Sequence, residues 1–125
     1  MTSGQSRKQT VLLVEDHAML RGILAESLAD EGFAVLTAED GEQALAIAGT
    51  LEGRLGLVIT DVLLPVMDGL ELAARLAYLK SPPPVLFISG VTTARDVPGP
   101  MLAKPFGPTA FLEQVGRMLP SVQHH

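Results

Sequence analysis

Short runs that are apolar at almost every position place the strongest constraint on how this chain folds. The clearest are Val11–Val14, Leu57–Thr60 and Val85–Ile88, while Met101–Ala103 is shorter and Phe33–Ala38 is weaker. A strand with one face in solvent alternates polar and apolar residues, whereas a strand covered on both faces is apolar throughout. These runs therefore predict five strands of a sheet that is buried on both faces.

Between these runs, apolar residues recur at the spacing of a helix. The predicted helices are Met19–Leu28, Asp40 to about Leu51, Leu70–Leu79 and Pro108–Leu119. On the first helix the apolar positions are Leu20, Ile23, Leu24 and Leu28. We expect Gly32 to end this helix, Asp40 to cap the second, and the three prolines at 82–84 to stop the third. Strands that alternate with helices predict an α/β fold, a doubly wound domain with a parallel sheet and right-handed crossovers.

The length of 125 residues suits a single domain. We expect a flexible lead-in over residues 1–9, the domain over 10–119, and a tail over 120–125 whose two histidines resemble the remnant of a purification tag. We therefore expect no separate output domain within these residues.

Composition excludes several classes of protein. The chain has no cysteine, which excludes a disulfide framework and a thiolate metal site. Its net charge of −5 argues against direct binding of nucleic acid. No apolar run approaches the ~18 residues of a membrane span. We therefore expect a cytoplasmic protein that contacts neither nucleic acid nor membrane.

The carboxyl ends of the predicted strands carry polar and charged side chains. Glu15 and Asp16 follow the first strand, Asp61 the third, Ser89 the fourth and Lys104 the fifth. Ligand sites of doubly wound sheets lie beyond these ends, where the strand order reverses. We therefore expect the five side chains to share one small pocket.

Three carboxylates in one pocket repel each other by roughly 4 kcal/mol per close pair at an effective dielectric constant near 20. Such a cluster requires a cation or shared protons. Oxygen ligands without histidine or cysteine suit Mg²⁺, and Mn²⁺ is also compatible. Lys104 would add a positive charge and Ser89 a hydroxyl donor, as phosphoryl transfer requires. A carboxylate can itself be the nucleophile and form an acyl phosphate.

Four short motifs occur at these strand ends. They are the acids after Val14, Asp61 followed by Pro-Val-Met-Asp-Gly at 65–69, the pair Ser89-Gly90, and the triplet Lys104-Pro105-Phe106. In this order, from about residue 10 to 119, the chain resembles the receiver domains of two-component signalling. The resemblance implies a flavodoxin-like sheet with strand order 2-1-3-4-5.

The resemblance also implies a role for each residue of the pocket. Asp61 would take a phosphoryl group from a histidine kinase or a histidine phosphotransfer protein, and the signal would pass to a downstream protein. Asp16, Asp61 and the backbone carbonyl of Leu63 would bind Mg²⁺ directly, and Glu15 would bind it through water. Ser89 and Lys104 would contact the phosphoryl oxygens. Such a domain is a phosphoacceptor switch rather than an enzyme, either stand-alone or excised from a hybrid kinase.

Two features depart from the pattern of the resembled family. Its members usually carry an aromatic residue three positions before the lysine, where this chain has Met101. Only residues 90–100 separate the fourth and fifth strands, whereas an average helix alone needs ~11 residues. We therefore expect the fourth helix of the family to be a single turn or absent.

Other interpretations of the same residues remain open. The acids could cap helices or turns, Ser89 could be a turn residue, and Lys104 could lie on the solvated surface. A haloacid-dehalogenase-like phosphatase also uses an aspartate and Mg²⁺, but it needs an acid two residues after the nucleophile, where this chain has Leu63. The main alternative is a receiver-shaped interaction module that is not phosphorylated.

Overall fold

The computed structural model describes residues 9–90 and 97–119. Within these ranges five strands form one sheet: β1 (Thr10–Val14), β2 (Ala34–Ala38), β3 (Leu57–Asp61), β4 (Val85–Ser89) and β5 (Met101–Ala103). Four helices are described: α2 (Ala18–Asp30), α3 (Gly41–Thr50), α4 (Gly69–Leu76) and α5 (Pro108–Met118). All strand pairs are parallel and the order is β2-β1-β3-β4-β5. The predicted fold class and strand order are confirmed.

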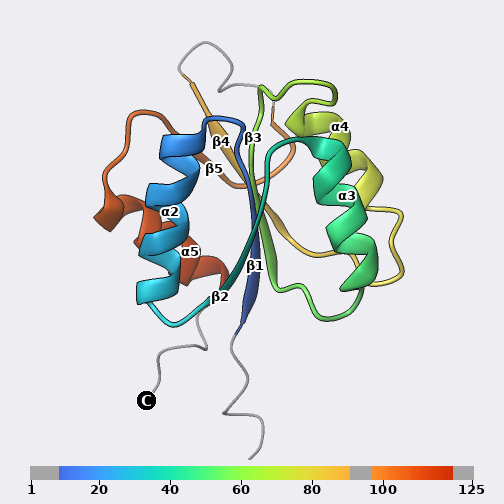
Figure 1. Cartoon of the computed structure of the whole chain (residues 1–125), viewed down its shortest axis with the longest axis horizontal. Helices are drawn as coiled ribbons and strands as arrows, with labels where there is room; N and C mark the ends of the chain where they lie inside the picture. Colours follow the sequence, from blue (N-terminus) through green and yellow to red (C-terminus); the bar gives the residue numbers. More distant parts are fainter. Residues whose placement is uncertain (1–8, 91–96, 120–125) are drawn as a thin grey trace, which may run out of the picture.

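The sheet lies between two layers of helices, with α2 and α5 on one face and α3 and α4 on the other (Figure 1). Alternate residues of β1 point to opposite layers. Val11 and Leu13 belong to the core beneath α2 and α5, and Leu12 and Val14 to the core beneath α3 and α4. All four are fully buried. The two buried faces explain why this strand is apolar at every position.

The helix ends follow from local chemistry. Gly32 has φ of 102° and follows α2, where the N–H of Phe33 donates to Leu28 and that of Gly32 to Ala29. This pattern satisfies the last carbonyl groups of the helix, and it needs the left-handed backbone that glycine adopts without strain. Because the N–H of Phe33 donates to the end of α2, this residue is not part of the sheet, and β2 begins one residue later than predicted. The carboxylate of Asp40 accepts the N–H of Gln43 and caps α3 as predicted.

Helix α4 is shorter than the sequence predicts. It ends at Leu76, three residues before the expected Leu79 and well before the prolines at 82–84. The N–H groups of Tyr78 and Leu79 each donate to a carbonyl three residues back, so the chain leaves the helix through tighter turns. At its start, Asp68 accepts the N–H of Glu71, a cap that the spacing of these two acids could have predicted.

One apolar position of α2 faces outward. Ile23, which matches the helical spacing of Leu24 and Leu28, is 55% exposed, whereas the other two are buried. None of the helices in the described parts of the chain is long and apolar enough to cross a membrane. The segment expected to hold a short or missing fourth helix lies partly outside the described residues, at 91–96, and 97–100 is not helical. The expected lead-in and tail also lie outside, except for Gln9.

Candidate functional site

The register of the sheet brings the strand ends of the predicted site to one level. Val14 pairs with Thr60, so that the next residues of the two strands, Glu15 and Asp61, lie side by side. Asp61 pairs with Ile88, directly before Ser89, on the other neighbouring strand. Parallel pairing therefore gathers residues that are far apart in the sequence at the carboxyl edge of the central strands.

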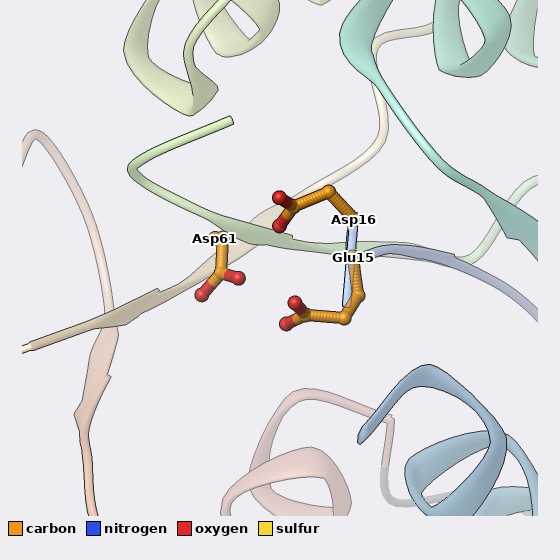
Figure 2. Close-up of side chains that lie close together, drawn as sticks. All are labelled: Glu15, Asp16 and Asp61. Carbon is orange, nitrogen blue, oxygen red and sulfur yellow. The ribbon is translucent and has the colours of Figure 1, made fainter. Parts of the chain in front are cut away.

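Three carboxylates share a small space at this edge (Figure 2). One oxygen from each of Glu15, Asp16 and Asp61 lies within 4.8 Å of the others. Glu15 and Asp61 are almost completely buried, at 1% and 5% exposure, whereas Asp16 is exposed. The cluster is therefore closed toward the protein core and open toward solvent on the side of Asp16.

A lysine and a serine complete the same edge. The ammonium Nζ of Lys104 lies 3.1 Å from Oδ1 of Asp61. The backbone N–H of Lys104 donates to the carbonyl of Ser89 at 2.8 Å, which fixes the two strand ends to each other. Ser89 is buried and its hydroxyl donates to the carbonyl of Gly90 at 3.0 Å. A positive charge and a hydroxyl thus lie beside the carboxylates.

The six residues predicted for the site line one surface pocket of about 420 Å³, and they are Glu15, Asp16, Asp61, Leu63, Ser89 and Lys104. Leu63 is 67% exposed, although it is apolar. Met101 lies in β5, half-buried and paired with Phe87. The pocket is therefore open to solvent at Asp16 and Leu63, whereas Glu15, Asp61 and Ser89 are buried.

Burial raises the pKa of Glu15 to about 8. The neighbouring carboxyl of Asp61 acts in the same direction, because it favours a proton shared between the two groups and carries a negative charge. The N–H of His17, which donates to Oε2 of Glu15 at 3.0 Å, and the charge of Lys104 lower the pKa. Near neutral pH a proton on Glu15 thus relieves the repulsion between the acids.

The donor set fits a hard divalent cation. Among the side chains that the structure describes, Oε1 of Glu15 is the buried polar atom that lacks a hydrogen-bond partner. Because an unsatisfied buried oxygen is costly, it indicates a site shaped for a further positive group. The three carboxylates supply only oxygen ligands, which suit Mg²⁺ better than softer metals.

The loop after β3 lies close against the end of that strand. The N–H of Gly69 donates to the carbonyl of Val62 at 2.7 Å, and that of Val62 to the carbonyl of Ile88 at 3.0 Å. A Cβ atom at Gly69 would overlap the backbone carbonyl of Asp61. The glycine at the start of α4 is therefore required for the helix to lie directly against the strand end that carries Asp61.

Sequence reasoning missed several residues that contact this site, among them His17 and Arg21. Arg21, in the first turn of α2, donates from Nη1 to the carbonyl oxygen of Glu15 at 2.8 Å. Its position six residues after Glu15 was the available signal, but a single arginine on a helix is ordinarily a surface residue. Only the direction in which α2 leaves β1 turns its side chain back to the strand end.

Known proteins resemble this chain in sequence and in fold. The sequence profile of the response regulator receiver domain matches residues 11–115. The transcriptional regulatory protein ResD of Bacillus subtilis is 29% identical over 121 residues, which cover 92% of this chain and 50% of ResD. The chain therefore spans about half the length of this curated relative.

Solved structures agree with the profile. The receiver domain of the hybrid histidine kinase CckA is 32% identical with a TM-score of 0.77, and the match covers 91% of this chain and 99% of that domain. The chemotaxis response regulator CheY4 of Vibrio cholerae is 30% identical with a TM-score of 0.78, covering 90% of this chain and 99% of CheY4. Since the profile match spans most of its length, the chain belongs to the family of response regulator receiver domains of two-component systems.

Proposed function

We propose that Asp61 is the phosphoryl acceptor of this receiver domain. The observation that carries the proposal is the position of its carboxylate, which ends the central strand, lies 3.1 Å from the ammonium of Lys104, and belongs to the cluster of three acids. A carboxylate in this position has a nucleophilic oxygen, a cation beside it for the charge of the incoming group, and access from solvent through the pocket.

We further propose that Asp16, Asp61 and the backbone carbonyl of Leu63 hold Mg²⁺ directly, and that Glu15 supports it through water. When bound, the cation would neutralise charge on the phosphoryl oxygens and lower the repulsion among the acids. The orphaned oxygen of Glu15 supports this assignment. Mn²⁺ has the same ligand preferences and would substitute.

In the proposed step an oxygen of Asp61 attacks phosphorus, an O–P bond forms, and the bond from phosphorus to the donor breaks. With a phosphohistidine donor the electron pair of the P–N bond returns to the imidazole nitrogen, which takes a proton from solvent. Lys104 and Ser89 would contact the oxygens of the transferred group. Positioning and charge neutralisation account for most catalysis of such transfers.

The donor is proposed to be a histidine kinase or a histidine phosphotransfer protein. The similarity to the receiver domain of a hybrid histidine kinase supports this class of donor. The phosphorylated domain would then act on a downstream protein. We place the functional unit at residues 10–119, which the profile match at 11–115 supports.

The proposal is tested by intact-protein mass spectrometry after incubation with acetyl phosphate. Wild type is expected to gain the mass of one phosphoryl group when Mg²⁺ is present and none in chelator. Asp61→Asn should gain none, whereas the matched variant Asp68→Asn, at the exposed cap of α4, should be labelled like wild type. Lys104→Ala should be labelled more slowly. A wild-type protein that takes no phosphoryl group under any of these conditions would instead favour an interaction module that is not phosphorylated.

A further inference from the structure

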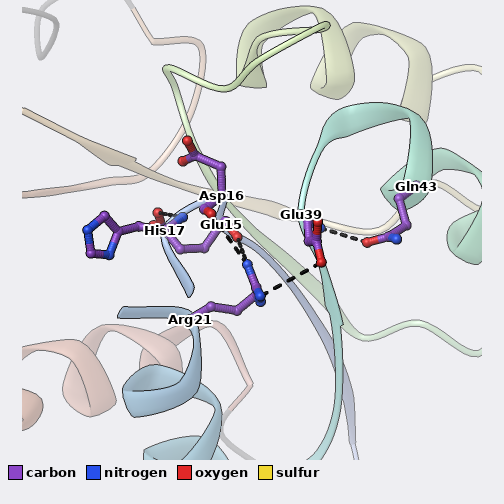
Figure 3. A network of polar contacts seen from close by, with 6 residues as sticks. All are labelled: Glu15, Asp16, His17, Arg21, Glu39 and Gln43. Atoms are coloured by element: carbon purple, nitrogen blue, oxygen red, sulfur yellow. Dashed lines mark hydrogen bonds and ion pairs between the residues drawn. The ribbon is translucent and has the colours of Figure 1, made fainter. Parts of the chain in front are cut away.

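Arg21 links the residues that follow β1 to the loop between β2 and α3. Its side chain is 19% exposed, which is low for an arginine, and it lies against the end of β1 (Figure 3). The guanidinium nitrogen Nη1 donates to the carbonyl of Glu15 at 2.8 Å and approaches that of Asp16 at 3.5 Å. The other nitrogen, Nη2, lies 3.9 Å from a carboxylate oxygen of Glu39, in the loop between β2 and α3.

The contact with Glu15 acts on both neighbouring acids at once. The carbonyl of Glu15 belongs to the peptide group that joins Glu15 to Asp16, and this group is planar. Fixing the direction of the oxygen therefore fixes the turn of the chain between the two residues. One carboxylate is buried beside Asp61 and the next is exposed at the mouth of the pocket.

The rest of the network reaches Arg21 through Glu39. The N–H of Glu39 donates to the side-chain oxygen of Gln43 at 2.7 Å, and Gln43 lies in the first turn of α3. Glu39 is 66% exposed, so solvent screens its ion pair with Arg21. The stronger contact is the charge-assisted hydrogen bond to the carbonyl of Glu15, and we assign the effect to it rather than to the ion pair.

We propose that Arg21 is a positioning residue, which holds the peptide group between Glu15 and Asp16 so that their carboxylates converge with Asp61 on one cation. The inference rests on the proposed metal site. It predicts the direction in which Mg²⁺ affinity changes when Arg21 is replaced. A nearby positive charge repels a divalent cation, so an arginine that acted by charge alone would weaken metal binding, and its removal would strengthen it. A positioning arginine does the opposite.

The test measures Mg²⁺ affinity by titration calorimetry for wild type, Arg21→Met and two matched variants. Loss of a residue that orients metal ligands typically costs about tenfold or more in affinity, and we expect this for Arg21→Met. Glu39→Gln, which removes the ion pair alone, should stay within about twofold of wild type because the pair is exposed. Arg75→Met should change nothing, since Arg75 pairs with Glu71 on the outer face of α4. Unchanged or tighter binding by Arg21→Met would overturn the inference.

A second measurement without metal separates this inference from the proposed function. In amide NMR spectra of the metal-free protein, Arg21→Met should shift the signals of Asp16 and His17, and Arg75→Met should not. If wild type binds no Mg²⁺ but these signals shift, the metal site is wrong and the positioning contact stands. If the signals of Asp16 and His17 are unchanged in Arg21→Met, the positioning role is wrong, whether or not the protein binds Mg²⁺.

Discussion

Glu15 combines burial with a neighbour of the same charge. Its side chain is 1% exposed, one of its oxygens has no partner among the described residues, and burial above all raises its pKa to about 8. The metal-free protein is therefore expected to carry a proton on this carboxyl near neutral pH. A cation at the cluster would take the place of this proton, so that proton and metal compete for the site.

The raised pKa predicts how the stability of the metal-free protein depends on pH. Between the ordinary pKa of 4.5 and the raised pKa of about 8, the folded state binds more protons at Glu15 than the unfolded state does. The free energy of unfolding therefore falls as pH rises through this range, by at most about 1.4 kcal/mol for each pH unit. Urea unfolding in chelator should give a lower midpoint at about pH 8 than at about pH 6.

Two variants check the origin of this slope. Glu15→Gln cannot ionise and should flatten the dependence, whereas Glu26→Gln, on the exposed side of α2, should keep it. If wild type is equally stable at both pH values, or if Glu15→Gln keeps the full slope, the carboxyl of Glu15 does not hold the proton.

Among the described glycines, Gly69 at the start of α4 has the least room for a side chain. A Cβ atom at Gly69 would overlap the carbonyl oxygen of Asp61. Gly69→Ala should therefore lower the free energy of unfolding by about 2 kcal/mol or more, as overpacking does, and should slow phosphorylation of Asp61. Gly22→Ala, in α2 with open space around it, should instead gain about 0.5–1 kcal/mol. Denaturant unfolding of both variants measures these changes in the free energy of unfolding. If Gly69→Ala is as stable as wild type, α4 can move away from β3.

The loop before α4 contains a strained residue. Val66 has φ of 71° and is 77% exposed, and the N–H of Met67 donates to the carbonyl of Pro65 across it. A positive φ at the central residue of such a three-residue turn is strained and costs about 1–3 kcal/mol, and asparagine tolerates positive φ better than valine does. Val66→Asn should therefore raise the thermal midpoint. Tyr78→Asn, at a similarly exposed position without positive φ, should not raise the thermal midpoint. An equal rise in both variants would show that relief of backbone strain is not the cause.

Most elements could be predicted because their signals are local. The apolar runs locate all five strands to within about a residue, and Gly32 and Asp40 end and cap helices as their chemistry requires. The end of α4 was missed because nothing in Ala77–Leu79 forbids helix. The exposure of Ile23 was missed because the whole of α2 is rich in apolar residues.

The gathering of the site residues could be predicted for a different reason. In a parallel sheet all strands point the same way, so polar residues at their carboxyl ends meet at one edge. Glu15, Asp16, Asp61, Ser89 and Lys104 needed no more than this rule. The contact of Arg21 with the carbonyl of Glu15 depends on the angle between α2 and β1, which no local pattern encodes.

At the scale of the whole molecule, a cation at one edge should stabilise the entire fold. A ligand that binds only the folded state adds about 1.4 kcal/mol of stability at ten times its dissociation constant. For a domain of this size we expect Mg²⁺ to raise the thermal midpoint by about 4 °C or more. Potassium chloride at equal ionic strength should not, and Asp16→Asn should lose most of the rise. The same rise in either control would point to general screening of the net charge of −5.

Phosphorylation of Asp61 would form an acyl phosphate on its side chain. Borohydride reduces an acyl phosphate of aspartate to homoserine but leaves free carboxylates unchanged, so peptide mapping after phosphorylation and reduction identifies the residue. We predict homoserine at position 61 in Mg²⁺ and acetyl phosphate, and at no other acid of the chain. Reduction at Glu15, Asp16 or Asp68, or a phosphorylated protein in which Asp61 remains aspartate after reduction, would contradict the account.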